Sequence, residues 1–402
     1  MTVAQKAGRR AFNRHGGGDG ALVLGRAIHP PWNEGTRVIA GDVAHLAAGR
    51  RDVRTLSLTE PDFMDEVDER IDVEHLPAPG GGRLSEYSGL PRMASRARFA
   101  AATGDFGVAH LVGVPLVLAP LLRRMGVKVV VHVTLSRHAY QGRVDRFRAL
   151  AAARAYGRYV DAWACAADPI RDDLLEAGYP AERLFVVPPG IDLDLFRAVD
   201  RGAARRSLGL ADDPFTVLYM GTVSPLRFPA PQIAAALADA AADVPGLSLA
   251  VVAPVRSHGY NVPWMDENVR RGLSGAGVEA TVELRDVDHA DKPAVYCAAD
   301  AVLVPFAAPV AVEPPLTLLE AMACEATVIA APHANRSRVI DHGRNGLVFE
   351  DAQGLADAVR HAASLGRAGA GLGMSARTTV SNRFSAAATL AALDNLWEAL
   401  GV

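Results

Sequence analysis

The residues best suited to chemistry stand together in the segment 313–328, which reads EPPLTLLEAMACEATV. Two prolines predict an extended approach, and the Leu-rich run of helix formers after them predicts a helix that begins at Leu316. The first amides of a helix have no acceptor inside it, so those of Leu316, Thr317 and Leu318 offer a site for an anion such as a diphosphate. Glu320, about one turn further on, can accept hydrogen bonds from a sugar hydroxyl. This combination indicates binding of a nucleotide sugar.

A second group of candidate ligands follows the predicted strand 215–220. Gly221 lets a phosphate approach the backbone, and Arg227 supplies a permanent cation with a fork of hydrogen-bond donors. Ser224 lies in the same loop and is included in the predicted donor site. Arg256, in the loop after the next predicted strand, is expected to reach the same anion. These residues predict a cationic side to the diphosphate site.

The rest of the chain predicts the sheets that would position these groups. Short apolar runs, typical of parallel strands buried on both faces, alternate with helical patterns. The predicted strands are 21–28, 54–58, 106–114, 127–133, 161–166, 215–220, 247–253, 281–284, 300–305, 327–330 and 346–349. The predicted helices are 36–48, 115–126, 143–159, 169–177 and 385–400, with another that begins at Pro231. The alternation predicts an α/β protein with doubly wound parallel sheets, and 402 residues suffice for two domains.

The segment 313–328 resembles the donor-binding signature of the retaining glycosyltransferases of family four, with its acidic residue, Pro/Gly-rich turn and Leu-Leu-Glu-Ala-Met-Ala helix. The segment 183–196, RLFVVPPGIDLDLF, is similar to the family's interdomain linker, and the likeness extends from about Leu22 to the C-terminus. Glu313 lies one position later than the first of the family's two usual glutamates, so either it takes the donor-sugar role through a one-residue shift or that contact is lost. The departures from the pattern are Val312 in place of that glutamate, Thr222 in place of an arginine and Glu325 in place of a glycine.

The resemblance implies the GT-B fold, in which two Rossmann-like doubly wound domains face a central cleft. It implies an N-terminal acceptor-binding domain over residues 21–190 and a nucleotide-sugar-binding domain over residues 191–384. The last helix, within residues 385–402, is expected to pack back on the first domain. Residues 1–20 are expected to form a disordered tail.

The resemblance also implies which residues form the site. The expected catalytic residues are His132, Glu313 and Arg227. The expected donor-binding residues are Gly221, Ser224, Arg227, Arg256, Val287, Glu313, Leu316, Thr317, Leu318 and Glu320. An acceptor or phosphate loop is expected at Asn33, Glu34 and Gly35, although the residues alone are equally consistent with an ordinary strand-to-helix turn. His132 and His110 both lie near the ends of predicted strands, where a single histidine is more often structural, and only His132 matches the family's sugar-contacting histidine.

The activity implied is that of a metal-independent, retaining glycosyltransferase of the hexosyltransferase type. It would move a sugar from a nucleoside-diphosphate sugar, with UDP the expected nucleotide, to a hydroxyl of a small-molecule, natural-product, lipid or glycan acceptor, without a cofactor. Two other interpretations stay open: a catalytically silent nucleotide-sugar-binding protein, suggested by Val312, Thr222 and Glu325, and a nucleotide-sugar epimerase on the same fold. The acceptor, the sugar and the oligomeric state are not readable from the sequence.

The composition and the apolar runs indicate which partners and which cellular location to expect. A formal net charge of −3, from 42 basic and 45 acidic residues, gives no reason to expect a nucleic-acid partner. No apolar run reaches the roughly 18 residues needed to span a bilayer, and no secretory signal is recognisable, so a cytoplasmic bacterial biosynthetic enzyme is expected, with peripheral membrane contact left open. The three cysteines lie in apolar settings and are expected to be buried thiols rather than metal ligands.

Overall fold

The computed structural model describes residues 18–29, 32, 34–65, 68–78, 89–136, 151–152, 154–209, 215–255, 262–366 and 370–402. Several predictions from the sequence lie outside these residues. They are Asn33, Arg256, nearly all of the expected N-terminal tail and most of the expected helix 143–159.

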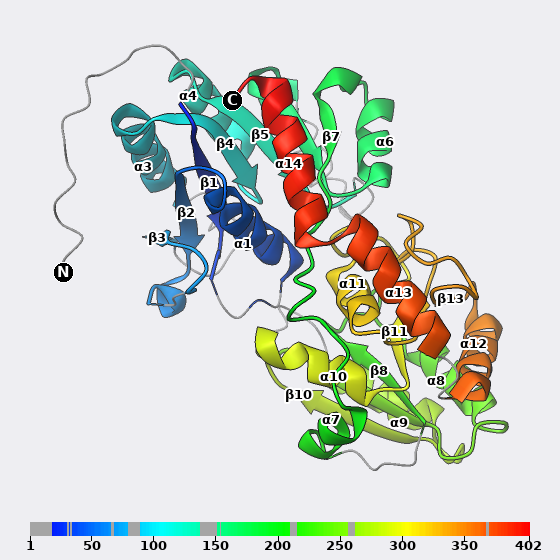
Figure 1. The fold of residues 1–402 in the computed structure, drawn as a ribbon. Coiled ribbons are helices and arrows are strands. Elements are labelled where there is room, and N and C mark those ends of the chain that lie inside the picture. The colour runs from blue at the N-terminus through cyan, green and yellow to red at the C-terminus, as the bar shows by residue number, and fades with distance from the viewer. Residues whose placement is uncertain are drawn as a thin grey trace.

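The first domain is built on a seven-stranded parallel sheet with the strand order β3-β2-β1-β4-β5-β6-β7 (Figure 1). Its strands are β1 (Gly20–Arg26), β2 (Val53–Thr59), β3 (Val73–Pro77), β4 (Phe106–Val112), β5 (Lys128–Val133), β6 (Ala162–Cys165) and β7 (Leu184–Val186). Its main helices are α1 (Gly35–Ala48), α3 (Leu90–Thr103), α4 (Ala119–Arg124) and α6 (Asp168–Glu176). The apolar run Ala21–Leu24 in β1 is fully buried because helices and neighbouring strands cover both faces of the sheet.

The second domain repeats the plan with six parallel strands in the order β10-β9-β8-β11-β12-β13. They are β8 (Thr216–Met220), β9 (Ser248–Ala253), β10 (Glu279–Leu284), β11 (Ala301–Val304), β12 (Val328–Ala330) and β13 (Leu347–Val348). The helices are α7 (Arg201–Ser207), α8 (Ala230–Ala240), α9 (Val262–Gly272), α10 (Lys292–Ala298), α11 (Leu316–Ala323), α12 (Ala352–Leu365) and α13 (Ala370–Arg383). Two doubly wound parallel sheets confirm the predicted fold class.

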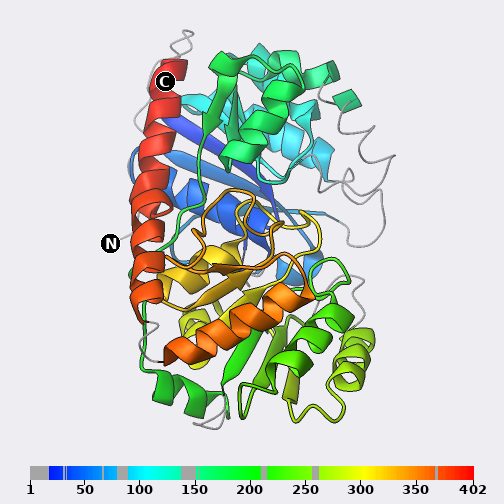
Figure 2. The same ribbon diagram turned by 90° about the vertical axis from the view of Figure 1, so that its right-hand side faces the viewer.

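The last helix, α14 (Ala386–Leu400), returns to the first domain as predicted. Leu393, Leu396 and Trp397 are buried in one cluster with Ala21 of β1 and Val130 of β5. Figure 2 shows α13 and α14 following one another along one side of both domains. The C-terminal helix therefore completes the core of a domain whose sheet is made from the first half of the chain.

The chain passes between the domains at two places that lie side by side. The Ile191 amide donates to the Phe384 carbonyl at 2.7 Å, and the Ala386 amide donates to the Ile191 carbonyl at 3.2 Å. Ile191 and Ser385 thus form an isolated parallel bridge. The helix α13, which precedes the bridge, packs on the second domain, where Arg377 Nη2 donates to the Leu193 carbonyl at 3.0 Å. The two passages lie close to the predicted domain boundaries, which themselves stay predictions.

The three cysteines are free thiols, and two of them, Cys165 and Cys324, are buried as predicted. Cys297 is only partly buried, in contrast to the prediction, and its sulfur accepts the Val199 amide, from the segment before α7, at 3.4 Å.

Candidate functional site

The loops that follow strands of the two sheets meet each other at the domain junction. The Glu313 amide, after β11, donates to the carbonyl of Thr134, which follows β5, at 3.0 Å. Lys292 Nζ, at the start of α10, donates to the carbonyl of Trp32, in the loop after β1, at 3.0 Å. The carboxyl edges of the two sheets therefore face each other, and this is the edge where open parallel sheets bind ligands.

The N-terminus of α11 lies at this junction with amides left for a ligand. Pro315 is the N-cap and makes no side-chain capping bond. The amides of Leu318 and Leu319 bond to the Pro315 carbonyl at 3.1 and 3.3 Å. The amides of Leu316 and Thr317 are therefore the ones that remain for an anion, whereas the sequence alone pointed to Leu318 as well.

Arg227 is brought to the loop that leads into α11, as a shared diphosphate site requires. Its Nη2 donates to the Val310 carbonyl at 2.7 Å, and the guanidinium lies 5.9 Å from the ring centroid of Phe306. Ser224 Oγ accepts the Arg227 amide at 3.2 Å and so shapes the turn that carries the arginine. Gly221 has a φ of 147°, a conformation that residues with a side chain rarely adopt. Among the residues that the structure describes, the Val310 carbonyl is the hydrogen-bond acceptor of this guanidinium, and the rest of its fork can meet an anion.

Glu320 is buried, with a relative exposure of 3%, and bonds to side chains of α10. Its Oε1 accepts from Lys292 Nζ at 3.2 Å, and its Oε2 accepts from the Tyr296 hydroxyl at 2.6 Å. Burial and the adjacent carboxylate raise the pKa of Tyr296 well above its ordinary value. A ribose hydroxyl would have to bind a carboxylate that already accepts hydrogen bonds from Lys292 and Tyr296 of α10. The predicted contact between Glu320 and a ribose stays a prediction.

Sequence reasoning missed Lys292 and Tyr296. The signal available for Lys292 was its rarity, because the chain of 402 residues contains only two other lysines, Lys6 and Lys128. Tyr296 stands one turn after Lys292, which places both on the same face of a helix and so opposite one carboxylate.

Glu313 is also buried and is bonded by the chain itself. One carboxylate oxygen accepts from the amide and the hydroxyl of Ser337, at 3.2 and 2.5 Å. Burial raises the pKa of Glu313, although the hydrogen bond from Ser337 and the charge of Arg336 act in the opposite direction. Arg336 in turn lies 3.7 Å from the carboxylate of Asp173 in the first domain. Glu313 thus belongs to a polar network across the junction, and its role toward a sugar stays a prediction.

The expected phosphate loop shows a structural role in its described part. Glu34 is the N-cap of α1, and its carboxylate accepts the amides of Thr36 at 3.1 Å and Arg37 at 2.9 Å. The anion position at this helix end is therefore filled by the chain's own carboxylate. Gly35 faces Val312 of the second domain so closely that a Cβ atom on it would lie 2.6 Å from a Val312 methyl group.

We expect Gly35→Ala to cost about 1–3 kcal/mol of stability, because the added methyl group overlaps Val312 at the domain junction. Val312→Ala in the same chain should restore most of the loss by making room. Urea unfolding of the two variants and of the double variant measures this. Gly49→Ala, at the other end of α1, is the matched control, since a Cβ there meets only a carbonyl at 3.4 Å. Equal stability of Gly35→Ala and the wild type would contradict the prediction.

His132 and Val287, the two remaining predicted site residues, lie in different domains. His132 is buried near the end of β5, and its Nε2 lies 2.8 Å from His110 Nδ1. Burial lowers the pKa of His132 to about 4, so its ring is neutral at physiological pH. Val287 lies half-buried in the loop after β10 and packs its side chain against the core. The roles predicted for both stay predictions.

Asp42 of α1 has a pKa far above the ordinary value of an aspartate. Burial raises its pKa to about 7, even though Arg70 Nη1 lies 3.9 Å away and lowers it. The charges of Glu320 and Asp192 raise it further, and that of Lys292 lowers it. Asp42 therefore faces the same polar junction as Glu320.

We expect Asp42→Asn to change how stability depends on pH. The folded protein holds a proton on Asp42 up to about pH 7, whereas the unfolded chain releases it near 3.8, so this group makes stability fall as pH rises between these values. The variant lacks this loss and should gain about 1–3 kcal/mol on the wild type between pH 4 and pH 8. Urea unfolding across this range tests it, with exposed Asp72→Asn as control. A difference that does not change with pH would refute the assignment.

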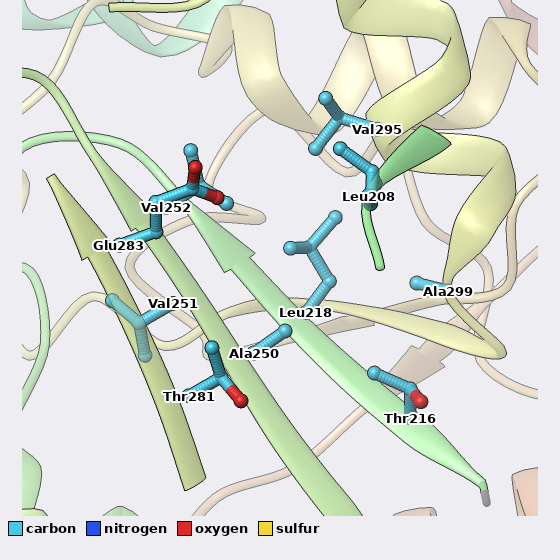
Figure 3. Close-up of a pocket in the computed structure, with 10 residues that line it drawn as sticks. All are labelled: Leu208, Thr216, Leu218, Ala250, Val251, Val252, Thr281, Glu283, Val295 and Ala299. Atoms are coloured by element: carbon cyan, nitrogen blue, oxygen red, sulfur yellow. The ribbon is translucent and has the colours of Figure 1, made fainter. Parts of the chain in front are cut away.

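A separate hollow lies in the second domain, between the strands β8 to β10 and the helix α10 (Figure 3). It is lined mainly by apolar side chains such as Leu218, Ala250 and Val295, with Glu283 at one edge. None of the predicted site residues lines it. Its lining offers no cation to a diphosphate, so it is not the predicted donor site.

Within the described part of the chain, no three side chains of His, Cys, Asp or Glu converge in a way that could hold a metal ion. Among the same residues, no helix combines the length and the apolar character needed to cross a bilayer.

Two doubly wound parallel sheets that meet at their carboxyl edges, with open helix amides and a guanidinium at the junction, define a protein of the GT-B class. Two family models match the chain: "Glycosyl transferases group 1" over residues 216–364 and "Glycosyl transferase 4-like domain" over residues 34–190. Together they cover most of the chain, which therefore belongs to the group 1 glycosyltransferases, as the sequence resemblance implied.

Curated relatives and solved structures agree with this assignment. A D-inositol 3-phosphate glycosyltransferase of Geodermatophilus obscurus is 34% identical over 205 residues, which are 48% of this chain and 43% of the relative. The protein of the same name from Mycobacterium tuberculosis is 32% identical over 197 residues, 48% of this chain and 39% of the relative. The match thus spans less than half the length of these relatives.

Among solved structures, HepE from Anabaena in complex with UDP-glucose has a TM-score of 0.73 at 20% identity, with 95% of this chain and 99% of that chain covered. Sucrose-phosphate synthase from Thermosynechococcus elongatus has a TM-score of 0.74 at 20% identity, with the same coverage of both chains. These similarities show that the fold is shared over nearly the whole chain.

Proposed function

We propose that this protein transfers a sugar from a nucleoside-diphosphate sugar, with UDP the expected nucleotide, to a hydroxyl group of its acceptor. The anomeric configuration is retained, and neither a metal ion nor a cofactor takes part. The observation that carries the proposal is the hydrogen bond from Arg227 to the Val310 carbonyl, in the loop that leads into α11 and its first amides, those of Leu316 and Thr317. A cation and two helix amides on one loop and the helix that follows it support the proposal that a diphosphate binds here.

In this reaction, negative charge builds up on the departing diphosphate. Donors that are already in place stabilise that charge without reorganising, and such preorganised groups supply a large part of catalysis. Arg227 is held by the Val310 carbonyl, and the α11 amides are fixed by the helix. His132 is proposed to contact the sugar and Val287 the base, with Arg256 as a further cation.

The acceptor is proposed to be a hydroxyl-bearing small molecule, lipid or glycan. The names of the curated relatives make an inositol phosphate the first acceptor to try. A cytoplasmic location with peripheral membrane contact left open is proposed with it, since a lipid acceptor would bring the protein to a membrane surface.

The first experiment is a thermal-shift panel with UDP, GDP, ADP and dTDP sugars. A donor bound only by the folded protein stabilises it by about 2.7 kcal/mol at a concentration of 100 Kd, so one nucleotide class should raise Tm clearly. Release of the nucleoside diphosphate is then followed with inositol phosphates and simple polyols, and proton NMR of the product reports the anomeric configuration. The proposal fails if no donor raises Tm and no diphosphate is released.

A catalytically silent nucleotide-sugar-binding protein is the second candidate. It is favoured by one specific observation: the carboxylates of Glu313 and Glu320 are both buried and bonded to the chain's own donors. Val312, at the position of the family's first glutamate, adds to it. A donor that raises Tm without any release of diphosphate in the presence of acceptors would establish this second function.

A further inference from the structure

The helix α14 is connected to the predicted sugar-contacting histidine by a chain of hydrogen bonds through the sheet. Trp397 of α14 is almost fully buried, and its Nε1 lies 2.9 Å from His110 Nε2. His110 of β4 in turn places Nδ1 at 2.8 Å from Nε2 of His132 in β5. The bond between Trp397 and His110 alone joins residues 287 positions apart in the sequence.

The direction of both bonds follows from the chemistry of the three rings. An indole nitrogen only donates, so His110 Nε2 accepts from Trp397 and carries no hydrogen. A neutral imidazole then carries its hydrogen on Nδ1, and His110 Nδ1 donates to His132 Nε2. The reverse direction would leave His110 with no hydrogen on either nitrogen, which is an imidazolate and not accessible at neutral pH. His132 therefore carries its own hydrogen on Nδ1.

The surroundings keep both imidazoles neutral. Burial lowers the pKa of His132 to about 4. Burial also lowers the pKa of His110 well below its ordinary value, and the neighbouring His132 and Arg51 lower it further. Arg51 lies over the Trp397 ring at 4.1 Å from its centroid, where a positive charge disfavours a second proton on the nearby His110. The tautomer of each ring is consequently set by hydrogen bonding and not by pH in the physiological range.

His132 ends this chain close to the domain junction. Two residues further on, the Thr134 carbonyl accepts the amide of Glu313 from the second domain at 3.0 Å. None of the other residues that the structure describes forms a hydrogen bond with His132 Nδ1. The one N–H group of this ring is therefore left for a ligand with an acceptor oxygen.

We infer that Trp397 and His110 are positioning residues that hold His132 as the Nδ1–H tautomer. His132 then offers a hydrogen-bond donor to an oxygen of the sugar nucleotide, and its Nε2 is not available as a base. The ligand side of this inference rests on the proposed function, whereas the tautomer does not. The consequence is that the C-terminal helix contributes to the chemistry of the site without touching the ligand.

The experiment is two-bond proton–nitrogen NMR on the full chain labelled with nitrogen-15 at histidine. The spectra distinguish the two neutral tautomers, and the losses of signal in His132→Gln and His110→Gln assign the two rings. We expect both rings in the Nδ1–H form in the wild type. In Trp397→Phe the aromatic ring stays but the donor is lost, so the proton on His110 is free to move to Nε2 and His132 should gain the Nε2–H form.

Trp163→Phe is the matched control, because it makes the same change at another buried tryptophan of the first domain. It should leave both tautomers unchanged, which separates a hydrogen-bond effect from general loosening. The inference is overturned if His132 is Nε2–H in the wild type or if Trp397→Phe leaves the spectrum of both rings unchanged.

Turnover gives a second readout. Loss of one correctly directed hydrogen bond should lower kcat/KM of Trp397→Phe about 2- to 10-fold. The same change in a His132→Gln background should have no further effect, and a full additive loss there would count against the inference. A wild-type chain that turns over no donor contradicts the proposed function instead, and the spectra then decide the tautomer by themselves.

Discussion

Replacing Lys292 by methionine is expected to cost about 3–5 kcal/mol of stability, because the change leaves a buried carboxylate without its charged partner. The methionine keeps most of the apolar volume but leaves the Glu320 carboxylate buried, with the Tyr296 hydroxyl as its one remaining donor among the residues that the structure describes. It also leaves the Trp32 carbonyl, in the other domain, without its donor. Urea unfolding of the full chain, followed by tryptophan fluorescence, measures the loss.

The partner variant and a control make the result specific. Glu320→Gln alone removes the charge that Lys292 balances, and the double variant should lose clearly less than the sum of the two single losses, because each single change leaves the other charge buried and unpaired. Lys128→Met is the matched control: its ammonium is partly exposed, 3.9 Å from Asp161, and should contribute less than about 1 kcal/mol. Additive losses would show that Lys292 and Glu320 are not coupled.

Replacing Arg227 by alanine is expected to lower kcat/KM about 100- to 1000-fold, as loss of a preorganised donor to a developing negative charge does in other enzymes. Thr222 stands where the family usually has another arginine, so we expect Arg227 to balance a larger share of the charge of the proposed diphosphate. Part of the effect is structural. The change removes the donor of the Val310 carbonyl, and this hydrogen bond holds the loop before α11 in position. Steady-state kinetics with the donor found in the panel measures it.

Two further variants separate charge from geometry. Arg227→Lys keeps the charge but loses the planar fork, so it should fall between the wild type and Arg227→Ala. Arg360→Ala removes a guanidinium of α12 that pairs with Asp239 and Asp243 on the surface, and it should leave kcat/KM unchanged. If Arg227→Ala binds and turns over the donor like the wild type, the diphosphate is held elsewhere.

The sheets were predictable because parallel strands buried on both faces have a simple signature. The continuous β-branched run predicted at 127–133 is β5 at 128–133, and the predicted helix 36–48 is α1 at 35–48. The strand β3 was not predicted, since VEHLP mixes polar and apolar residues and acquires its strand conformation by pairing with β2 at the edge of the sheet. Short helices such as α10, whose burial comes from neighbouring elements, leave an equally weak pattern.

For the candidate site, local patterns predicted which groups belong together but not their partners. The helix start at Leu316 and the loop of Arg227 were predicted separately, and the structure joins them through Val310, 83 positions from Arg227. The bond between Lys292 and the Trp32 carbonyl links positions 260 apart, for which no local pattern exists. The direction of the Glu313 carboxylate depends on Ser337, and a one-residue shift along an extended approach changes which neighbours a side chain meets.

The bridge between Ile191 and Ser385 ties the two passages of the chain into a single pivot. Any opening of one lobe against the other has to be shared by both passages, while α13 moves with the second lobe and α14 with the first. Because Trp397, His110 and His132 all pack in the first domain, such an opening would leave the bonds between them intact. The contacts of Lys292 with Trp32 and of Glu313 with Thr134 join the two lobes, so an opening motion would have to break them.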